Sequence, residues 1–416
     1  MKLLTFLGDG KYSQTTYVLG AYECQAKFAP IASAVHLNAD SITIFLTEEA
    51  QQNHFTTLCA DLKAERPEIE IVPIPIQQGR NETELWQIFS QIQVAVEPDE
   101  EVAFDITHGL RSSPLLGLLA AAFLRSSGKI KLRGVFYGAY EVRDKENNRT
   151  PIFDLTPMIV LLDWSAAADR FVRTGDARFL ASLVAERRKE LALAAVGDMA
   201  LKDQAGKLGH LSKALGDVSR SLVLLRPDDV MESVASLPGY VEAARPALER
   251  SLGTLPFSSL LQRVTESYQP LAFPAPKDTA RMAERLEVER RMIHWYAEHE
   301  HWMQAISLSR EWLVSWTMLH LNLEDLLTER ENVEKILGEQ ARAYRNFREQ
   351  KSAGEFDLAN LRSVPQAVLA LQLWLELSDR RNDIDHAGMR EEPKSADTLI
   401  KGIEACIKKL DALPLQ

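Results

Sequence analysis

The chain has 416 residues, with 48 Lys and Arg against 59 Asp and Glu, which gives a net charge of −11. This length predicts two or three domains, and the 46% hydrophobic and 26% charged residues exclude a largely disordered chain. The acidic balance excludes unselective coating of nucleic acid but is compatible with a small RNA site. Three widely spaced cysteines indicate a reducing cytoplasm, without disulfides or a cysteine zinc site. The longest apolar run, residues 115–124, is about half of a membrane span, so we expect no membrane contact.

Residues 1–165 alternate short β-rich runs with helical segments. Most runs are continuously apolar, as in a sheet that is buried on both faces. We expect strands at residues 2–7, 41–46, 69–76, 101–106 and 131–140, and helices near 25–37, 48–64, 82–93 and 112–126. This alternation predicts a Rossmann-like α/β domain with a doubly wound, mostly parallel sheet. Such sheets bind ligands beyond the carboxyl ends of their strands, so the residues that follow the strands matter most.

From about residue 154 onward the hydrophobic periodicity is helical, and we expect no further strand. The expected helices lie within residues 164–224, 229–253, 279–297, 302–328, 331–350, 366–386 and 395–412. A proline-rich loop is expected around residues 256–276. The second part of the chain, residues 166–416, is therefore predicted to be all α-helical.

The first strand leads into the sequence Gly8-Asp9-Gly10-Lys11-Tyr12. Glycines at a strand end let backbone N–H groups approach a phosphate or ribose, while Lys11 offers charge and Tyr12 a ring for stacking. The pattern is neither GxGxxG nor a P-loop. By itself, a tight turn would also explain it.

The fourth strand leads into DITHGLRSSP, residues 105–114. This segment brings a carboxylate, hydroxyl groups, an imidazole, a glycine and an arginine to the start of a helix, where anions bind readily. A capped helix alone would explain the serines and Pro114 but not the DxTHG cluster.

Together these motifs resemble the CRISPR-associated DxTHG proteins, whose N-terminal domain is a CARF (CRISPR-associated Rossmann-fold) sensor. The resemblance rests on FLGDGKY, IPIQQGRNETELW, DITHGLRSSP and PIFDLTPMIVLLDW, which occur in this order within the first 165 residues. It implies a homodimer or higher homo-oligomer whose strand-end loops bind a cyclic oligoadenylate, with a ring of four adenylates favoured over six. The candidate ligand contacts implied by the resemblance are Gly8, Lys11, Tyr12, Thr107, His108, Gly109 and Arg111.

A second motif lies near the end of the chain, where four residues separate Arg381 from His386 and Asn382 follows the arginine. This resembles the R-x4-6-H motif of HEPN ribonucleases, in the RNxxxH form that they often show. Its position in a helical segment behind a CARF-like domain strengthens the resemblance. We therefore assign Arg381, Asn382 and His386 as candidate catalytic residues.

Cleavage of RNA by such residues requires neither a metal nor a cofactor. The ribose 2′-OH attacks the adjacent phosphate, histidine transfers protons near neutral pH, and arginine stabilises the extra negative charge on phosphorus. Asn382 could orient the phosphate or the imidazole. The expected products end in a 2′,3′-cyclic phosphate.

Two features complicate this site. Residues five apart on a continuous helix point about 140° apart, so Arg381 and His386 of one chain meet a single phosphate poorly. We therefore expect either a local helix break or a composite site across a dimer. The nearby carboxylates of Asp379, Asp383 and Asp385 would repel RNA, unless they hold Arg380 and Arg381 in place.

A further cluster contains His294, His299 and His301. Its spacing does not match HExxH, so we expect a solvated turn between two helices rather than a metal site. Nearby tryptophans are expected to be core or interface anchors: Trp295, Trp302, Trp312 and Trp316.

The sequence thus predicts a sensor domain at residues 1–165 and a ribonuclease domain at residues 166–416. The expected function is a cytoplasmic, cyclic-oligoadenylate-activated, metal-independent endoribonuclease that cleaves single-stranded RNA in type III CRISPR antiviral defence. One alternative is a signal-binding dimer module without nuclease activity. Another is a CARF-type transcription regulator, although no basic recognition helix is evident. A third is that the CARF site degrades its own activator, for which Thr107, His108 and Lys11 would suffice chemically.

Overall fold

In the computed structural model, the chain forms two compact units, Met1–Ser165 and Ala166–Gln416. The structure describes residues 1–109, 112–252, 256–323, 327–350, 355–389 and 392–415. Within these ranges, all strands lie in the first unit, and the second unit is entirely helical. The predicted order of an α/β part followed by an all-α part is therefore confirmed.

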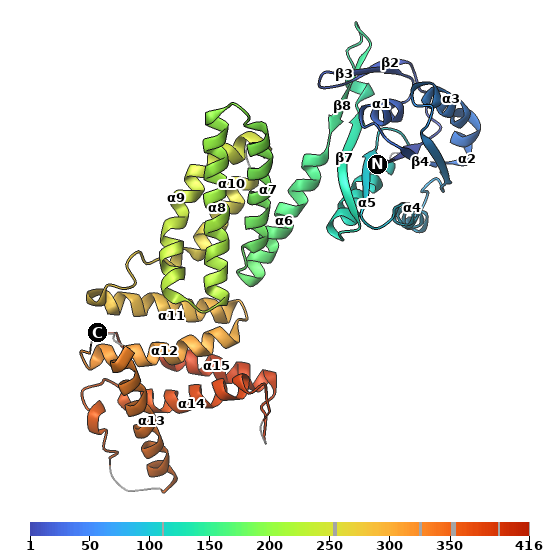
Figure 1. Ribbon diagram of the computed structural model, residues 1–416. Coiled ribbons are helices and arrows are strands. Elements are labelled where there is room, and N and C mark those ends of the chain that lie inside the picture. Colours follow the sequence, from blue (N-terminus) through green and yellow to red (C-terminus); the bar gives the residue numbers. More distant parts are fainter. Residues whose placement is uncertain (110–111, 253–255, 324–326, 351–354, 390–391, 416) are drawn as a thin grey trace. The chain divides into compact units, whose positions relative to one another are not determined.

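The first unit contains an eight-stranded sheet (Figure 1) in the order β3-β2-β8-β7-β6-β1-β4-β5. Its strands are β1 (Lys2–Leu7), β2 (Thr15–Leu19), β3 (Tyr22–Ala26), β4 (Ser41–Leu46), β5 (Glu70–Pro75), β6 (Glu100–Asp105), β7 (Ile130–Gly138) and β8 (Arg149–Asp154). The five strands from β7 to β5 are mutually parallel, whereas the pairs β2–β3 and β7–β8 are antiparallel. From β1, the chain first adds β4 and β5 on one side of the sheet. It then adds β6 and β7 on the other side of β1, so the topological switch point lies between β1 and β6.

Helices cover both faces of this sheet. They are α1 (Ala29–His36), α2 (Glu48–Ala50), the π-helical segment Gln51–Phe55, α3 (Thr56–Glu65), α4 (Glu82–Val94) and α5 (Ser113–Ser126). Successive side chains of a strand point to opposite faces. Accordingly, Leu3 and Leu7 of β1 pack in one core with α1 and α3, while Leu4 and Phe6 pack in another with α4 and α5. The predicted doubly wound sheet is confirmed.

Three strands were missed by the sequence analysis: β2, β3 and β8. The first two form a hairpin through Gly20, whose φ of 61° lies in the left-handed region that favours glycine. Because residues 25 and 26 pair within this hairpin, the helix expected at residues 25–37 begins only at Ala29.

The helices of the second unit form two groups (Figure 1). The first of them, α6 (Thr156–Thr174), begins in the first unit and continues into the second. The others are α7 (Arg178–Ala194), α8 (Met199–Val223), α9 (Pro227–Leu252), α10 (Pro256–Tyr268), α11 (Met282–Glu298), α12 (Trp302–His320), α13 (Leu327–Glu349), α14 (Ala367–Asp385) and α15 (Ala396–Asp411). In the first group α8 packs against α7 and α9, and α10 packs against α9. In the second group α12 contacts α11, α13, α14 and α15.

The prediction of a proline-rich loop around residues 256–276 was partly wrong, because α10 occupies the first half of this range. This helix begins with a proline, which is tolerated in a first turn because its missing N–H group has no helical partner there. In the described part of the chain, no helix is both long and apolar enough to cross a membrane.

Candidate functional site

The loops after β1 and β6 meet at the switch point of the sheet. Gly8 follows β1, and a Cβ atom at this position would lie 3.0 Å from the carbonyl carbon of Gly109 in the DITHG loop. Gly109 has a φ of 118°, and a side chain there would collide with Phe6 and Ser113. The two loops can approach each other because both positions are glycine.

Asp105 and Thr107 fix the DITHG loop to its neighbours. Asp105 is fully buried, and its carboxylate accepts hydrogen bonds from the Ser33 hydroxyl of α1 and, at 3.0 Å, from the backbone N–H of Thr107. Burial raises the pKa of Asp105, and these hydrogen bonds oppose the rise. The hydroxyl oxygen of Thr107 accepts a 2.8 Å hydrogen bond from the N–H of Gly138. The loop is thus tied to both α1 and β7.

His108 is a neutral ring within this site. Its Nε2 accepts a 3.0 Å hydrogen bond from the backbone N–H of Ala29, so the proton of the neutral ring is on Nδ1. The ring centroid lies 4.5 Å from that of Tyr12 and 6.3 Å from that of Phe28. Burial lowers the pKa of His108 to about 3, with a further contribution from His54. At neutral pH, His108 can therefore offer a ligand an N–H group but no charge.

Tyr12 stabilises the β1 loop, since its hydroxyl donates a 2.7 Å hydrogen bond to the carbonyl oxygen of Gly8. Its ring centroid lies 5.1 Å from that of Phe28 and 4.9 Å from that of His54. The adjacent Lys11 is exposed and available to a ligand. Arg111, the other predicted cation, lies outside the described residues.

The sequence analysis did not assign Asp9, Asn53 or His54 to this site. Oδ1 of Asp9 accepts a 2.8 Å hydrogen bond from Nδ2 of Asn53 and lies 3.3 Å from Nε2 of His54. Both partners come from the π-helical segment that follows α2. A π-helical turn has no clear sequence pattern, so the approach of His54 to the β1 loop could not be foreseen.

The candidate catalytic residues lie at the C-terminal end of α14. Arg381 lies four residues before the end of the helix at Asp385, Asn382 is exposed, and the exposed His386 directly follows the helix. Nε of Arg381 lies 3.2 Å from Oδ2 of Asp385, and these two side chains are 38% and 35% exposed. The helix continues to Asp385, so the local break considered from the sequence is absent between residues 381 and 385. Arg381 and His386 therefore share one helix end but leave it in different directions.

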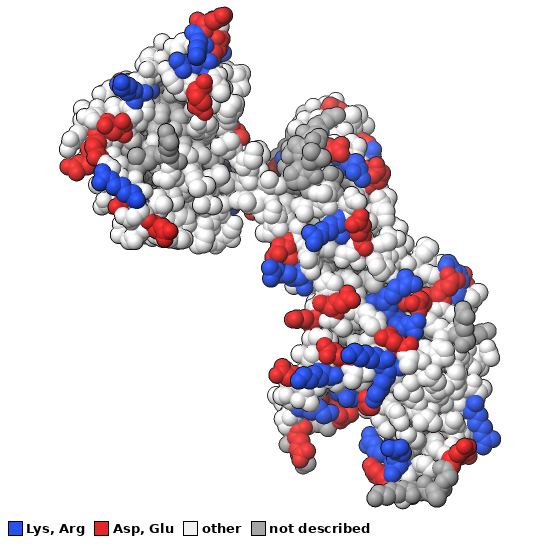
Figure 2. Space-filling view, turned by 180° about the vertical axis from the view of Figure 1, so that it is seen from behind, with Lys and Arg blue, Asp and Glu red and all other residues white. Residues whose placement is uncertain are grey.

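The carboxylates near Arg381 have cationic or N–H partners. Asp379 forms an ion pair with Lys394, and Asp383 is 1% exposed and accepts a 3.3 Å hydrogen bond from the backbone N–H of Lys394. With the pair between Arg381 and Asp385, each of the three predicted aspartates has a stabilising partner. Figure 2 shows a similar mixture of basic and acidic side chains over the visible face of the helical unit.

The prediction of a turn between two helices holds for two of the three histidines, because His294 lies within α11. His299 follows α11 and His301 precedes α12, while His294 pairs with Asp411 at 2.8 Å. Across the described ranges, no three His, Cys, Asp or Glu side chains are grouped to hold a metal ion. The core prediction is confirmed for three tryptophans, all nearly or fully buried: Trp295, Trp312 and Trp316.

Two comparisons of the sequence with known proteins name the same CRISPR-associated protein. Residues 160–270 match the family model of the second domain of CRISPR-associated protein MJ1674. The curated CRISPR-associated protein MJ1674 of Methanocaldococcus jannaschii is 29% identical over 120 residues, which are 28% of this chain and 19% of that protein. Over this region, the chain is similar to a CRISPR-associated protein. The matched region spans about a fifth of the length of this relative, and the family match ends before α11.

Among solved structures, the chain is similar to Enterococcus italicus Csm6 bound to cyclic hexa-2'-fluoro-hexa-dAMP. The two are 12% identical, with a TM-score of 0.46, and the alignment covers 99% of this chain and 92% of the other.

Proposed function

We propose that the protein is a cyclic-oligoadenylate-activated, metal-independent endoribonuclease of type III CRISPR defence that acts in the cytoplasm. The first unit is the sensor and the second unit cleaves single-stranded RNA. The observation that carries the proposal is the pair of the partly exposed Arg381 and the exposed His386 at the end of α14, in a chain similar to a CRISPR-associated protein.

The chemistry of the pair suits RNA cleavage. Histidine changes charge near neutral pH and can take the proton of the attacking 2′-OH or return one to the departing 5′-oxygen. The guanidinium of Arg381 is permanently charged and can donate two hydrogen bonds to one phosphate. Its present partner, Asp385, is about one-third exposed, so a phosphate can compete with this carboxylate for the arginine.

The geometry favours a site shared between two chains. Because α14 is continuous as far as Asp385, Arg381 and His386 leave it in different directions. Two copies that face each other can place an arginine of one chain opposite the histidine of the other. We therefore propose that the active form is a homodimer.

An exposed apolar surface on the first unit supports this dimer. A groove of about 500 Å³ lies between α4 and α5, and its lining is almost entirely hydrophobic. Three of its side chains are strongly exposed: Trp86 at 69%, Phe123 at 50% and Leu119 at 48%. Contiguous apolar surface of this kind usually marks a protein interface, and a second copy of the chain is the simplest partner.

The strand-end loops offer what a ring of adenylates requires. Gly8 and Gly109 expose backbone at close approach, Lys11 supplies charge, and the neutral His108 retains an Nδ1–H donor. Tyr12 is already packed against other rings, so we propose that it shapes the loop rather than stacking freely on a base. The width of the site depends on how the two chains of the dimer pair. The proposed preference for a ring of four adenylates depends on this width.

The decisive experiment is cleavage of a labelled single-stranded RNA in EDTA, with each cyclic oligoadenylate offered separately. We expect cleavage only with the matching ring, 2′,3′-cyclic phosphate ends, and no cleavage by the Arg381→Ala protein. Activity that is lost in EDTA and restored by Mg²⁺ would overturn the mechanism.

One observation favours a second candidate, a binding module without nuclease activity. Arg381 already has a carboxylate partner in Asp385, so the phosphate of RNA meets a competing negative charge at this arginine. Unchanged RNA in the presence of every activator, despite tight activator binding, would establish this alternative.

A further inference from the structure

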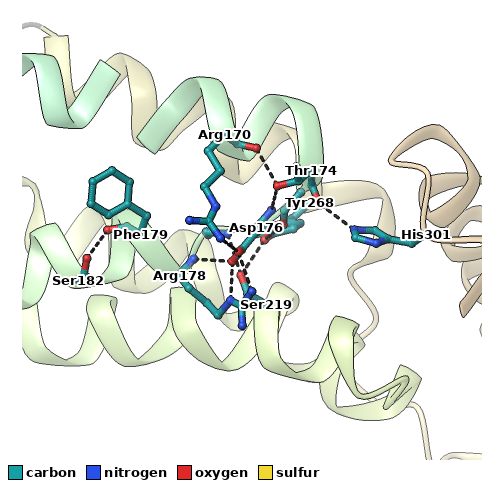
Figure 3. A network of polar contacts seen from close by, with 11 residues as sticks. Arg170, Thr174, Asp176, Arg178, Phe179, Ser182, Ser219, Tyr268 and His301 are labelled. Carbon is teal, nitrogen blue, oxygen red and sulfur yellow. Dashed lines mark hydrogen bonds and ion pairs between the residues drawn. The ribbon is translucent and has the colours of Figure 1, made fainter. Parts of the chain in front are cut away.

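A cavity of about 240 Å³ lies in the second unit where α6, α7, α8, α11 and α12 meet, and none of its lining residues belongs to either candidate site. Its charged or hydrogen-bonding side chains come from all five of these helices and from the segments that connect α6 with α7 and α11 with α12. Figure 3 shows the polar network on one side of this cavity, with Arg170 and Arg178 directed toward Asp176. The residues that line the cavity include Arg170, Asp176, Arg178, Trp295 and His301.

Two arginines share one buried carboxylate here. Nη2 of Arg170 lies 2.9 Å from Oδ2 of Asp176, while Nε and Nη2 of Arg178 each donate to this carboxylate at 2.8 Å. The Asp176 side chain is 11% exposed, whereas the arginines are 53% and 52% exposed. One guanidinium would neutralise the carboxylate, so the second leaves an excess positive charge beside the cavity.

The excess charge persists over the physiological pH range. Burial raises the pKa of Asp176, but the hydrogen bonds and charge of Arg178, together with the charge of Arg170, outweigh it and leave the pKa below its usual value. Each guanidinium has five N–H donors, of which the contacts to Asp176 use one from Arg170 and two from Arg178. The remaining donors are available to an anion at the half-exposed ends of the two side chains.

Two ring N–H groups belong to residues that line the cavity, His301 and Trp295. Nε2 of His301 lies 2.9 Å from the carbonyl oxygen of Thr174, which can only accept, so this nitrogen donates its proton there and not to a ligand. The indole Nε1 of Trp295 is buried and has no hydrogen-bond partner in the part of the chain that the structure describes. Buried donors without a partner are rare in proteins and call for an explanation.

The indole of Trp295 is fixed in place. It stacks on His299 at a centroid distance of 4.0 Å, and a Cβ atom on Gly175 would lie 2.1 Å from its Cη2. Gly175 also has a φ of 66°, so both the turn and the adjacent ring require glycine. The carbonyl oxygen of Gly175 accepts a 2.7 Å hydrogen bond from Tyr268, which fixes the turn further. The cavity wall is therefore preorganised.

We propose that this cavity binds a small phosphate-bearing ligand, no larger than one nucleotide, through Arg170 and Arg178. Paired guanidinium groups suit phosphate because they donate in a planar, bidentate geometry. The apolar side chains of Leu222 and Val223 also line the cavity and offer a surface for a sugar or base. Its volume lies below the roughly 300–1,000 Å³ of pockets for drug-sized molecules, which excludes a nucleic-acid strand from the interior.

Calorimetric titration of the full chain at low salt tests the proposal, with inorganic phosphate and AMP as separate probes. We expect both to bind, and Arg170→Gln and Arg178→Gln each to weaken binding by roughly tenfold or more, as for the loss of a charged hydrogen bond. The matched control is Arg173→Gln on the same helix, because this arginine is 75% exposed and pairs with Asp169 outside the cavity. The control should bind both probes like the parent protein.

The Asp176→Asn variant distinguishes a ligand site from a purely structural ion pair. Removal of the competing carboxylate should tighten binding of phosphate, a gain that a misfolded protein cannot produce. Absence of binding by the parent, equal weakening in the Arg173→Gln control, or binding of single-stranded RNA but of neither small probe would each overturn the proposal.

Discussion

The backbone N–H of Ala29 donates a 3.0 Å hydrogen bond to Nε2 of His108, and this contact joins the first turn of α1 to the loop that follows β6. It explains why a histidine is useful at this position. The ring satisfies a helix N–H that has no partner within the helix, fills space between Tyr12 and Phe28, and still presents one N–H group on its other nitrogen. A positively charged ring would lose the acceptor.

The first prediction concerns acid stability. The pKa of His108 is about 3 in the folded chain and about 6.5 when unfolded, so the unfolded chain binds more protons between these values. The contribution of the neutral ring to the free energy of unfolding is therefore fully present above about pH 6.5. It decreases toward pH 3, by up to about 1.4 kcal/mol per pH unit. The His108→Gln protein keeps an acceptor for Ala29 without this titration. Its free energy of unfolding in urea should fall less steeply between pH 7 and about 4.

The control for this measurement is His36→Gln, since His36 is exposed in the last turn of α1. This variant should keep the steep pH dependence of the parent protein. If the His108→Gln protein also followed the parent curve, His108 would be charged in the folded chain and the hydrogen bond from Ala29 would be absent.

The second prediction concerns the close approach of the two loops. In Gly109→Ala, the new Cβ would lie 2.9 Å from atoms of Phe6 and Ser113 at a φ of 118°, so we expect the free energy of unfolding to fall by about 3 kcal/mol or more. Gly128 has a φ of 70°, but a Cβ atom there would meet no other atom within 4 Å, and Gly128→Ala should cost only about 1–2 kcal/mol of backbone strain. Thermal unfolding of the two variants compares these losses. Equal losses would mean that Gly109 is not packed against Phe6 and Ser113.

How far the sequence predicts this molecule depends on whether a feature is local. Continuous apolar runs identified β1, β4 and β6 because a sheet buried on both faces requires them. The hairpin of β2 and β3 was missed, since its short, mixed strands gain their stability by pairing with each other and with β8.

The candidate site shows the same distinction. The sequence indicated that residues near Gly8 and Gly109 would meet, because their strands end at the same edge of a parallel sheet. It could not indicate that His54 joins them, or that His108 is neutral. Both depend on burial and on contacts between segments that are distant in sequence.

The third prediction concerns binding of the activator by the first unit. Lys11→Ala should weaken binding of the cyclic oligoadenylate by roughly 10- to 100-fold, as expected for a lost hydrogen bond between charged groups. The fold should be unaffected, because Lys11 is exposed. Lys131→Ala is the matched control, since Lys131 is exposed near the start of β7, at the opposite edge of the sheet. Equal affinities of the two variants in a direct binding assay would exclude Lys11 from the site.

The last prediction concerns whether the Arg381 and His386 that act on one phosphate come from the same chain or from two chains. If each site combines Arg381 of one chain with His386 of the other, the Arg381→Ala and His386→Ala proteins should each be inactive but still form dimers and bind activator. A mixed dimer of the two variants then has one site without either residue and one site with both. After subunit exchange, an equal mixture should recover up to about a quarter of the parental rate, since about half of the dimers are mixed and each has one intact site.

The alternative arrangement gives the opposite result. If Arg381 and His386 of the same chain served one phosphate, neither chain of the mixed dimer would have a complete pair, and the mixture would be as inactive as its parts. The continuity of α14 as far as Asp385 favours the shared site, because a straight helix directs residues five apart about 140° away from each other. A mixture of the parent protein with the double variant is the control for exchange: under the shared arrangement its mixed dimers contain no complete site, whereas under the alternative they retain one.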